Sequence, residues 1–336
     1  MDFIKWWTLL FILIVNGSYS QESSSFRCVA LGVKGGGFEN NLTSFLIQGD
    51  RSKKMICLDA GSLLSSIDHA YNKGSFGFLN INIKSDTLPV GQILYNHISS
   101  YLISHGHFDH ISGLIIASPL DNNKKIFASS PTFRSLHEDV FNWSSWANFT
   151  DRGTSPYINR YKTVVMDFHK FYKDEDSGLE IKAYPLTHVK GYSSTAFLIK
   201  NGGDYILYFG DTGSDKIQEV DNLSKVWEEV APLVQSKKLK AVFLECSFPN
   251  ERADHLLFGH LTPKLFLSEL SKLADYSTDK DALPLEGLKV VITHIKPSLI
   301  TKDGITNKSK IIRQLKDGNN LGCKLIFPER GECLVL

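Results

Sequence analysis

Short apolar runs alternate with polar and amphipathic segments along most of the chain. The pattern predicts strands over residues 26–33, 43–48, 54–58, 98–103, 125–129, 163–168, 179–185, 195–199, 205–209, 239–244 and 288–293. Helices are expected over residues 62–71, 113–117, 223–235 and 263–274, and one is expected to end over 311–315. Two closing strands, 324–327 and 332–336, are expected to pair as a hairpin across residues 328–331. Strands that alternate with helices favour an α/β fold.

The first twenty residues depart from this pattern. Lys5 precedes an apolar run over residues 6–15, and small polar residues follow up to Ser20. The run is short for a membrane span. It predicts a signal peptide over residues 1–20 that is cut after Ser20, with an uncleaved N-terminal anchor as the alternative. Residues 21–336 are then expected to form a single domain, secreted to the cell exterior or a periplasm, with no membrane association after cleavage.

Secretion would make the Asn-x-Ser/Thr triplets candidate glycosylation sites. They lie outside the signal segment at Asn41, Asn142, Asn148, Asn222 and Asn307. In a eukaryotic secreted protein these asparagines could carry glycans, so a glycoprotein is expected in that setting. In a bacterial periplasm they would have no such role.

The composition argues mainly against certain kinds of partner and metal site. The 336 residues carry a formal net charge of +1, with 42% hydrophobic and 22% charged residues, as in ordinary globular proteins. Nothing in the bulk charge indicates a nucleic-acid partner. The five cysteines show no Cys-x-x-Cys spacing, which argues against a cysteine zinc site. Cys323 and Cys333 flank the predicted hairpin and could pair, while the odd count leaves at least one thiol without an intrachain partner.

Residues 105–110, His-Gly-His-Phe-Asp-His, bring three histidines and one aspartate together between an apolar strand and the start of a helix. Imidazole and carboxylate ligands suit zinc or a similar divalent ion. His105 and His107 alternate and can point the same way, whereas Asp109 and His110 lie past the bend and can reach a second ion. The alternative is a polar loop with surface histidines.

Further polar residues follow other predicted strands. They are Asp59, His188, Asp211, Glu245 and His294, and His260 lies just before a helix that Thr262 can cap and Pro263 begins. Asp59 could also be a simple turn or helix-cap residue. Trp143 and Trp146, three residues apart, could form an aromatic wall of a pocket, but the spacing favours packing into the body of the protein.

These motifs carry a family resemblance. His-x-His-x-Asp-His resembles the signature of the metallo-β-lactamase superfamily. The run from His105 to Pro119 is similar to that of class II cyclic nucleotide phosphodiesterases, which usually have Leu in place of Phe108. Glu-x-Ser-Phe at 245–248, Gly-His-Leu-Thr-Pro at 259–263 and Thr-His-x-Lys-Pro at 293–297 are similar as well. The resemblance implies a four-layer αββα sandwich.

The resemblance also implies a site with two divalent metal ions, zinc being the first expectation. One ion would take His105, His107 and His188, the other Asp109, His110 and His294, and Asp211 would bridge them. The ions would share a hydroxide that attacks the phosphorus of 3′,5′-cAMP, or cGMP, and yields the 5′-monophosphate.

Three further residues receive roles beyond the metal ligands. His260 is a candidate proton donor to the leaving 3′-oxygen, or a phosphate-binding residue, and Glu245 is a candidate for orienting it. Asp109 counts as catalytic besides being a ligand, and Lys296 could sense the anionic substrate.

Other functions share parts of this pattern. A phosphodiesterase acting on RNA ends, such as a tRNA 3′-processing nuclease, would use the same ligands, although the signal peptide and near-neutral charge argue against it. Another hydrolase of the superfamily would lack the matches at 118–119 and 259–263. A non-enzymatic cyclic-nucleotide binder would have broken ligands, yet all seven positions are intact. The sequence leaves open the preference between cAMP and cGMP, the oligomeric state and the host.

Overall fold

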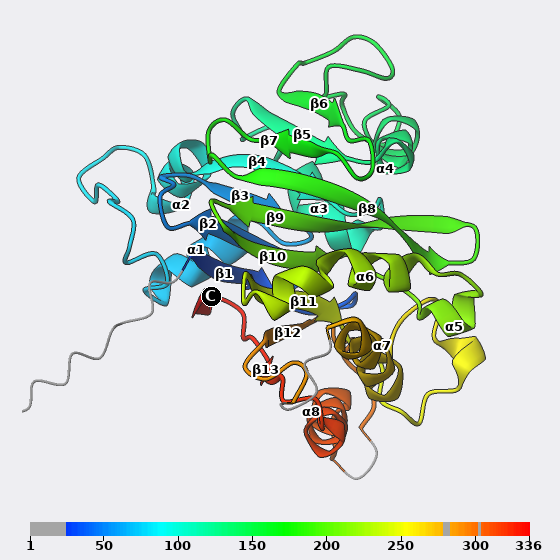
Figure 1. The fold of residues 1–336 in the computed structure, drawn as a ribbon. Helices are drawn as coiled ribbons and strands as arrows, with labels where there is room; N and C mark the ends of the chain where they lie inside the picture. The colour runs from blue at the N-terminus through cyan, green and yellow to red at the C-terminus, as the bar shows by residue number, and fades with distance from the viewer. Residues whose placement is uncertain (1–24, 278–282, 302–303) are drawn as a thin grey trace, which may run out of the picture.

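A computed structural model describes residues 25–277, 283–301 and 304–336. The predicted signal peptide therefore lies outside the described residues. The described chain forms two seven-stranded sheets with helices outside them (Figure 1).

The first sheet is built from the N-terminal half and the last strand. Its spatial order is β14 (Cys333–Val335), β1 (Phe26–Gly32), β2 (Ser44–Gly49), β3 (Met55–Leu58), β4 (Ile98–Ile103), β5 (Lys124–Ala128) and β6 (Tyr161–Val165). The strands from β3 to β6 run parallel, so their carboxyl ends meet at one edge.

The second sheet is built from the C-terminal half. Its spatial order is β13 (Lys324–Ile326), β12 (Lys289–Thr293), β11 (Leu239–Glu245), β10 (Asp204–Phe209), β9 (Tyr192–Asn201), β8 (Glu180–Val189) and β7 (Phe171–Lys173). Here β10, β11, β12 and β13 are parallel.

Helices cover the outer faces of the sheets. They are α1 (Leu64–Asn72), α2 (Pro89–Gln92), η1 (Ile93–His97), α3 (Phe108–Ala117), α4 (Ser130–Ser135), η2 (Leu136–Val140), α5 (Asp215–Gln218), α6 (Asn222–Gln235), η3 (Asp254–Leu256), α7 (Pro263–Tyr276) and α8 (Asn307–Gly318). Within the described ranges, no helix is both long and apolar enough to cross a membrane.

Three apolar clusters hold these layers together. Side chains alternate along β1: Cys28 and Ala30 join the cluster between the sheets, whereas Val29 and Leu31 join the cluster under the first sheet's helices. The third cluster packs α6, α7 and α8 on the second sheet around the fully buried Trp227. The layers are therefore helix, sheet, sheet and helix, which confirms the predicted αββα sandwich.

The predicted closing hairpin is wrong. β13 pairs with β12 in the second sheet, whereas β14 pairs with β1 in the first. The short connection between them thus crosses from one sheet to the other. Cys323 and Cys333 do not form a disulfide, and all five cysteines are free.

The two tryptophans do not share a helix. The side chain of Asn142 accepts hydrogen bonds from the backbone N–H groups of Ser144 and Ser145, which bends the chain. Trp143 has a φ of 67° and is 44% exposed, whereas Trp146 is half-buried against the core. Only Trp146 packs as the spacing predicted.

Candidate active site

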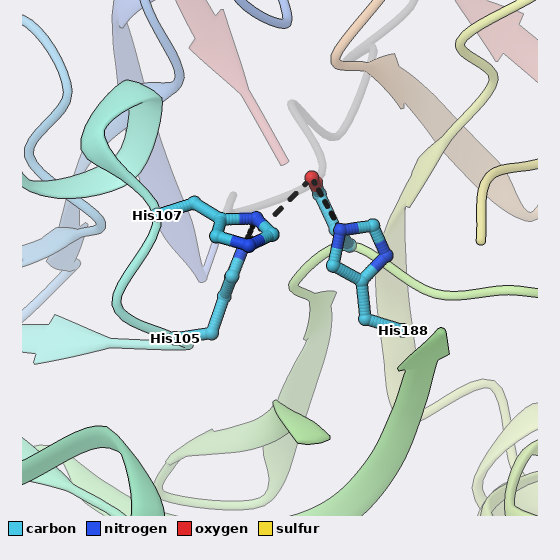
Figure 2. A group of neighbouring side chains, drawn as sticks. His105, His107 and His188 are labelled. Atoms are coloured by element: carbon cyan, nitrogen blue, oxygen red, sulfur yellow. Dashed lines mark hydrogen bonds and ion pairs between the residues drawn. The ribbon is translucent and has the colours of Figure 1, made fainter. Parts of the chain in front are cut away.

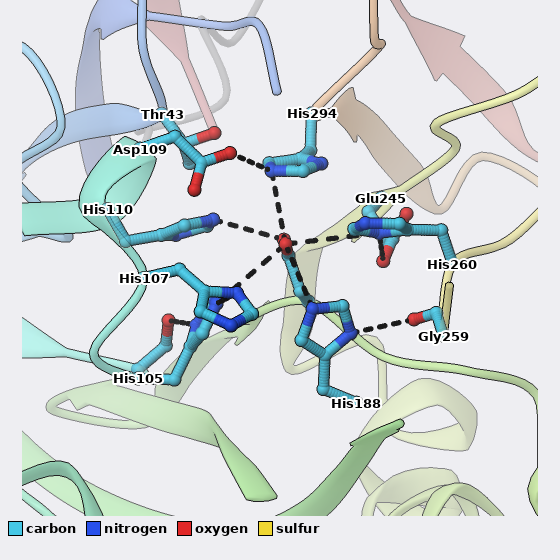
Figure 3. Close-up of polar contacts among 12 residues, drawn as sticks. Thr43, His105, His107, Asp109, His110, His188, Glu245, Gly259, His260 and His294 are labelled. Carbon is cyan, nitrogen blue, oxygen red and sulfur yellow. Dashed lines mark hydrogen bonds and ion pairs between the residues drawn. The ribbon is translucent and has the colours of Figure 1, made fainter. Parts of the chain in front are cut away.

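The polar residues predicted at strand ends gather in one cluster (Figure 3), although His188 lies within β8 rather than past the end of a strand. β4 leads directly into the turn that carries His105 and His107, and Asp211 follows β10. Glu245 ends β11 and His294 follows β12. Because these strands are parallel within each sheet, their carboxyl ends deliver the side chains to the same edge.

A first group of donor atoms combines His105, His107, His188 and Asp211, all within 4.8 Å of one another. His105 Nε2 and His188 Nε2 each lie 3.8 Å from Asp211 Oδ2. His105 Nε2 lies 3.1 Å from His107 Nδ1. Figure 2 shows the three imidazole rings around one carboxylate oxygen. Three imidazoles and one carboxylate are a donor set that suits zinc.

A second group combines Asp109, His110, His294 and the same Asp211, again within 4.8 Å. His110 Nε2 lies 3.2 Å from Asp211 Oδ1, and His294 Nε2 lies 3.1 Å from Asp211 Oδ2. Asp109 Oδ2 lies 3.1 Å from His294 Nε2. Asp211 thus presents one carboxylate to both groups, and the structure brings together all seven predicted ligand positions.

Residues 104–107, between β4 and α3, are called the metal turn below. The helix after this turn begins earlier than its apolar pattern predicted. α3 starts at Phe108, so Asp109 and His110 lie in its first turn rather than in a loop before it. An acidic residue is favourable there because the helix dipole is positive at its N-terminus. From this first turn both side chains reach His294: Asp109 Oδ2 lies 3.1 Å from its Nε2, and the His110 ring stacks on its ring with centroids 5.0 Å apart.

The Nδ1 atoms of His110, His188 and His294 point away from the donor cluster, and each has a polar partner in the protein. Asp59 Oδ2 accepts from His110 Nδ1 at 2.8 Å, and the Gly259 carbonyl accepts from His188 Nδ1 at 2.9 Å. Ser247 Oγ lies 2.9 Å from His294 Nδ1. Such partners fix the tautomer and the orientation of a ligand ring.

Gly259 can hold His188 only because it lacks a side chain. Its φ is +75°, and a Cβ there would lie 1.8 Å from the carbonyl oxygen of His188. The close approach requires glycine at this position.

The electrostatics of both groups fit bound cations. Burial lowers the pKa of His105, and it lowers that of His188 to about 4, so both rings are neutral ligands at pH 7. Burial also disfavours a charged His110, but the carboxylates of Asp211 and Asp59 outweigh it and raise its pKa. His110 Nε2 is buried, and its 3.2 Å contact with Asp211 Oδ1 lacks hydrogen-bond geometry, so this nitrogen has no hydrogen-bond partner in the described structure. The carboxylates thus favour positive charge at a buried nitrogen, as a metal ion would supply.

His260 and Glu245 form a pair beside the second group. Glu245 Oε1 lies 2.8 Å from His260 Nδ1, and Ser247 Oγ donates to Glu245 Oε2 at 2.5 Å. His260 Nδ1 is 3.9 Å from Asp211 Oδ2, and its ring stacks on that of His294 with centroids 5.1 Å apart. Lys296 Nζ reaches within 4.0 Å of Asp109 Oδ2.

Sequence reasoning assigned no role to several residues that shape the site. Tyr192 stacks on His107 with centroids 4.5 Å apart, and Tyr208 donates to Asp59 Oδ2 at 2.6 Å. Ser104 lies with its Oγ 3.0 Å from His105 Nδ1. Ser247 was visible as part of the Glu-x-Ser-Phe motif, but the tyrosines come from strands of another sheet and carried no local signal.

Comparison with known proteins gives consistent results. The family model described as cAMP phosphodiesterases class-II matches residues 26–331. A probable 3′,5′-cyclic-nucleotide phosphodiesterase of Yersinia pestis is 41% identical, covering 93% of this chain and 90% of its own. A 3′,5′-cyclic-nucleotide phosphodiesterase of Aliivibrio fischeri is 38% identical and covers 97% of both chains.

Solved structures share the fold. Unliganded yeast PDE1 superposes with a TM-score of 0.78 at 22% identity, covering 93% of this chain and all of its own. The metallo-β-lactamase fold protein YhfI of Bacillus subtilis gives a TM-score of 0.57 at 14% identity, covering 93% and 99%.

Proposed function

We propose a two-metal hydrolysis of 3′,5′-cyclic nucleotides for this chain, which belongs to the class-II cAMP phosphodiesterase family and is a cyclic-nucleotide phosphodiesterase with the metallo-β-lactamase fold. One observation carries the mechanism: two ligand groups share the carboxylate of Asp211. Asp211 Oδ2 faces His105, His188 and His294, and Oδ1 faces His110, so this one carboxylate is within reach of both groups and is suited to bridging two cations. The substrate proposed is 3′,5′-cAMP, with cGMP as a second substrate.

The ligand groups assign residues to each ion. His105, His107 and His188 would hold one, while Asp109, His110 and His294 would hold the other, with zinc as the metal proposed. When bound, such a pair of ions would lower the pKa of water, so that it can act as the nucleophile, and would offset charge on the phosphoryl oxygens.

The protein's own groups act on the leaving side. In the reaction, a water molecule loses a proton and its oxygen bonds to phosphorus, the bond from phosphorus to the 3′-oxygen breaks, and that oxygen takes a proton. His260 is the proposed donor, and Glu245 positions its ring through the 2.8 Å contact at Nδ1. Lys296, near Asp109, is proposed to attract the anionic substrate.

Hydrolysis assays test this function. The purified protein is given 3′,5′-cAMP and 3′,5′-cGMP in parallel, with His107→Ala and a chelated sample as controls, and its metal is identified by elemental analysis. We expect the nucleoside 5′-monophosphate to form and to be lost in both controls. No turnover of either nucleotide by protein that holds two equivalents of metal would refute the substrate assignment.

The N-terminal sequence bears on localisation. We propose that residues 1–20 direct secretion, as the apolar run after Lys5 favours. Amino-terminal sequencing of exported protein is expected to begin at Gln21, and a mature chain that keeps Met1 would contradict this. In a glycosylating host, Asn148 is expected to stay unmodified because its side chain is buried and donates to the carbonyls of Arg152 and Thr154.

A further inference from the structure

A cavity lies on the far side of α4 from the turn that carries His105 and His107. It has a volume of about 390 Å³ and lies between α4, η2, β6 and residues 152–154. Along α4 and η2 it is lined by Ser130, Phe133, Arg134 and His137. These residues are spaced three, four and seven positions from the first, so they occupy one face of the helical segment.

Another face of the same segment contacts the metal turn. Thr132 Oγ1 donates to the carbonyl of Ser104 at 3.2 Å, and Ser135 packs against Gly106, where an added Cβ would lie 2.6 Å from that of Ser135. The cavity is therefore separate from the ligand groups. The helix α4 lines the cavity on one face and contacts the metal turn on another.

Two buried polar atoms in the cavity lining have no partner in the described structure. They are His137 Nε2 and Thr163 Oγ1. The His137 ring is held in place by stacking on Phe133, with centroids 5.5 Å apart and planes at 24°. Buried polar groups in native proteins are nearly always hydrogen-bonded, so the two atoms indicate a missing partner.

The charged groups around the cavity indicate what that partner is. Arg134 and Arg152 both line it, and in the described part of the chain neither guanidinium makes a hydrogen bond or an ion pair. Glu138 is the one carboxylate in the lining, so the two guanidinium groups leave an excess of positive charge. Outside the lining, Asp151 keeps its negative charge but pairs with neither guanidinium, and its Oδ1 accepts from the Thr163 backbone N–H at 2.9 Å. Guanidinium groups bind phosphate oxygens in pairs of parallel hydrogen bonds.

We propose that this cavity binds a small phosphate-bearing anion, with Arg134 and Arg152 on the phosphate and with His137 Nε2 and Thr163 Oγ1 hydrogen-bonded to it. The site is distinct from the metal centre and does not depend on the proposed reaction. Inorganic phosphate and a nucleoside monophosphate share the required chemistry. Phe133 and Val165 give the cavity apolar walls that could contact the nucleoside.

Calorimetric titration of the metal-loaded, full-length protein tests the proposal, with inorganic phosphate and 5′-AMP as separate probes. The Arg134→Ala/Arg152→Ala variant should bind phosphate at this site at least about tenfold more weakly for each guanidinium lost. Lys162→Ala is the matched control, because Lys162 is an exposed cation on the same strand, one residue from Thr163. Tighter binding of 5′-AMP than of phosphate would identify a nucleotide as the occupant, and equal binding would identify the phosphate group alone.

Two further variants separate this site from the metal centre. Phosphate binding at the cavity should persist in His107→Ala. It should weaken severalfold in Thr163→Val, which keeps the side-chain shape. The proposal is overturned if the arginine double variant binds phosphate like Lys162→Ala, or if His107→Ala abolishes all phosphate binding.

Discussion

The carboxylate of Glu245 and the imidazole of His260 form a buried pair at the edge of the ligand cluster, with Oε1 2.8 Å from Nδ1. If His260 donates the proton to the leaving oxygen, His260→Ala should lower kcat about 10²–10⁴-fold with little change in KM. Glu245→Gln, which keeps the shape but loses the charge, should lower kcat about 10–100-fold. Steady-state kinetics with cAMP measure both.

Glu269→Gln controls for loss of a buried carboxylate. Glu269 is 1% exposed and lies on α7, with Oε2 3.0 Å from Lys272 Nζ and away from the ligand groups. It should change stability but not kcat. A rise in KM with unchanged kcat in His260→Ala would instead assign His260 to phosphate binding.

Asp59 is expected to support the metal centre without touching a metal. Its carboxylate accepts from His110 Nδ1, the Ser104 backbone N–H, Ser104 Oγ and Tyr208 Oη, at 2.6–2.8 Å. Asp59→Asn should weaken metal binding about 10–100-fold, because an amide cannot accept all of these bonds. Tyr208→Phe removes one donor only and should lower the free energy of unfolding by about 1 kcal/mol. Metal titration and denaturant unfolding measure the two effects, and equal metal affinity in wild type and Asp59→Asn would contradict the role.

The ligand positions were predictable because their signals are local. A polar residue at the end of an apolar strand can be recognised without knowing the partner strand, and parallel pairing then brings Asp211, Glu245 and His294 to one edge. The closing hairpin was mispredicted for the opposite reason. Strands that are close in sequence usually pair, but β13 and β14 each complete a different sheet, and that depends on distant partners. The roles of Tyr192 and Tyr208 could not be predicted, because their contacts to His107 and Asp59 form only across the two sheets.

Gly259→Ala should disrupt the first ligand group. The added Cβ would collide with the His188 carbonyl at 1.8 Å, so the backbone that holds His188 must move. We expect a loss of metal affinity and of activity of at least about tenfold. Gly287→Ala is the matched control, because Gly287 has a φ of +78° but nothing within 4 Å of an added Cβ. It carries the same backbone strain without the collision. Similar metal affinities in the two variants would contradict this account of Gly259.

Buried histidines should make the metal-free protein sensitive to mild acid. Burial lowers the pKa of His188 from 6.5 to about 4, so between these values the unfolded chain binds a proton that the folded chain does not. The contribution of His188 to the free energy of unfolding should therefore be largest above pH 6.5 and fall by about 3 kcal/mol as the pH approaches 4, whereas His110, whose pKa is raised, contributes with the opposite sign. Denaturant unfolding of chelated protein across this range measures the slope. His188→Gln should flatten the slope, whereas the same change at the exposed His255 should leave it unaltered.

The five cysteines should stay reduced even if the protein is exported. Cys28 and Cys333 lie on paired strands, but Cys28 faces the cluster between the sheets and Cys333 packs against the cluster under the helices, so their thiols point to opposite faces. Burial raises the pKa of Cys57 and of Cys323 to about 12, which leaves almost no thiolate at pH 8. Alkylation of the native protein at that pH should modify Cys333 first, since it alone of the five is only half-buried.

Mass spectrometry of the alkylated peptides gives the order of modification. In denaturant without reductant all five thiols should react, and the melting temperature should be the same with and without reductant. A pair of cysteines that reacts only after reduction would show a disulfide and contradict this prediction, because all five thiols are free in the structure.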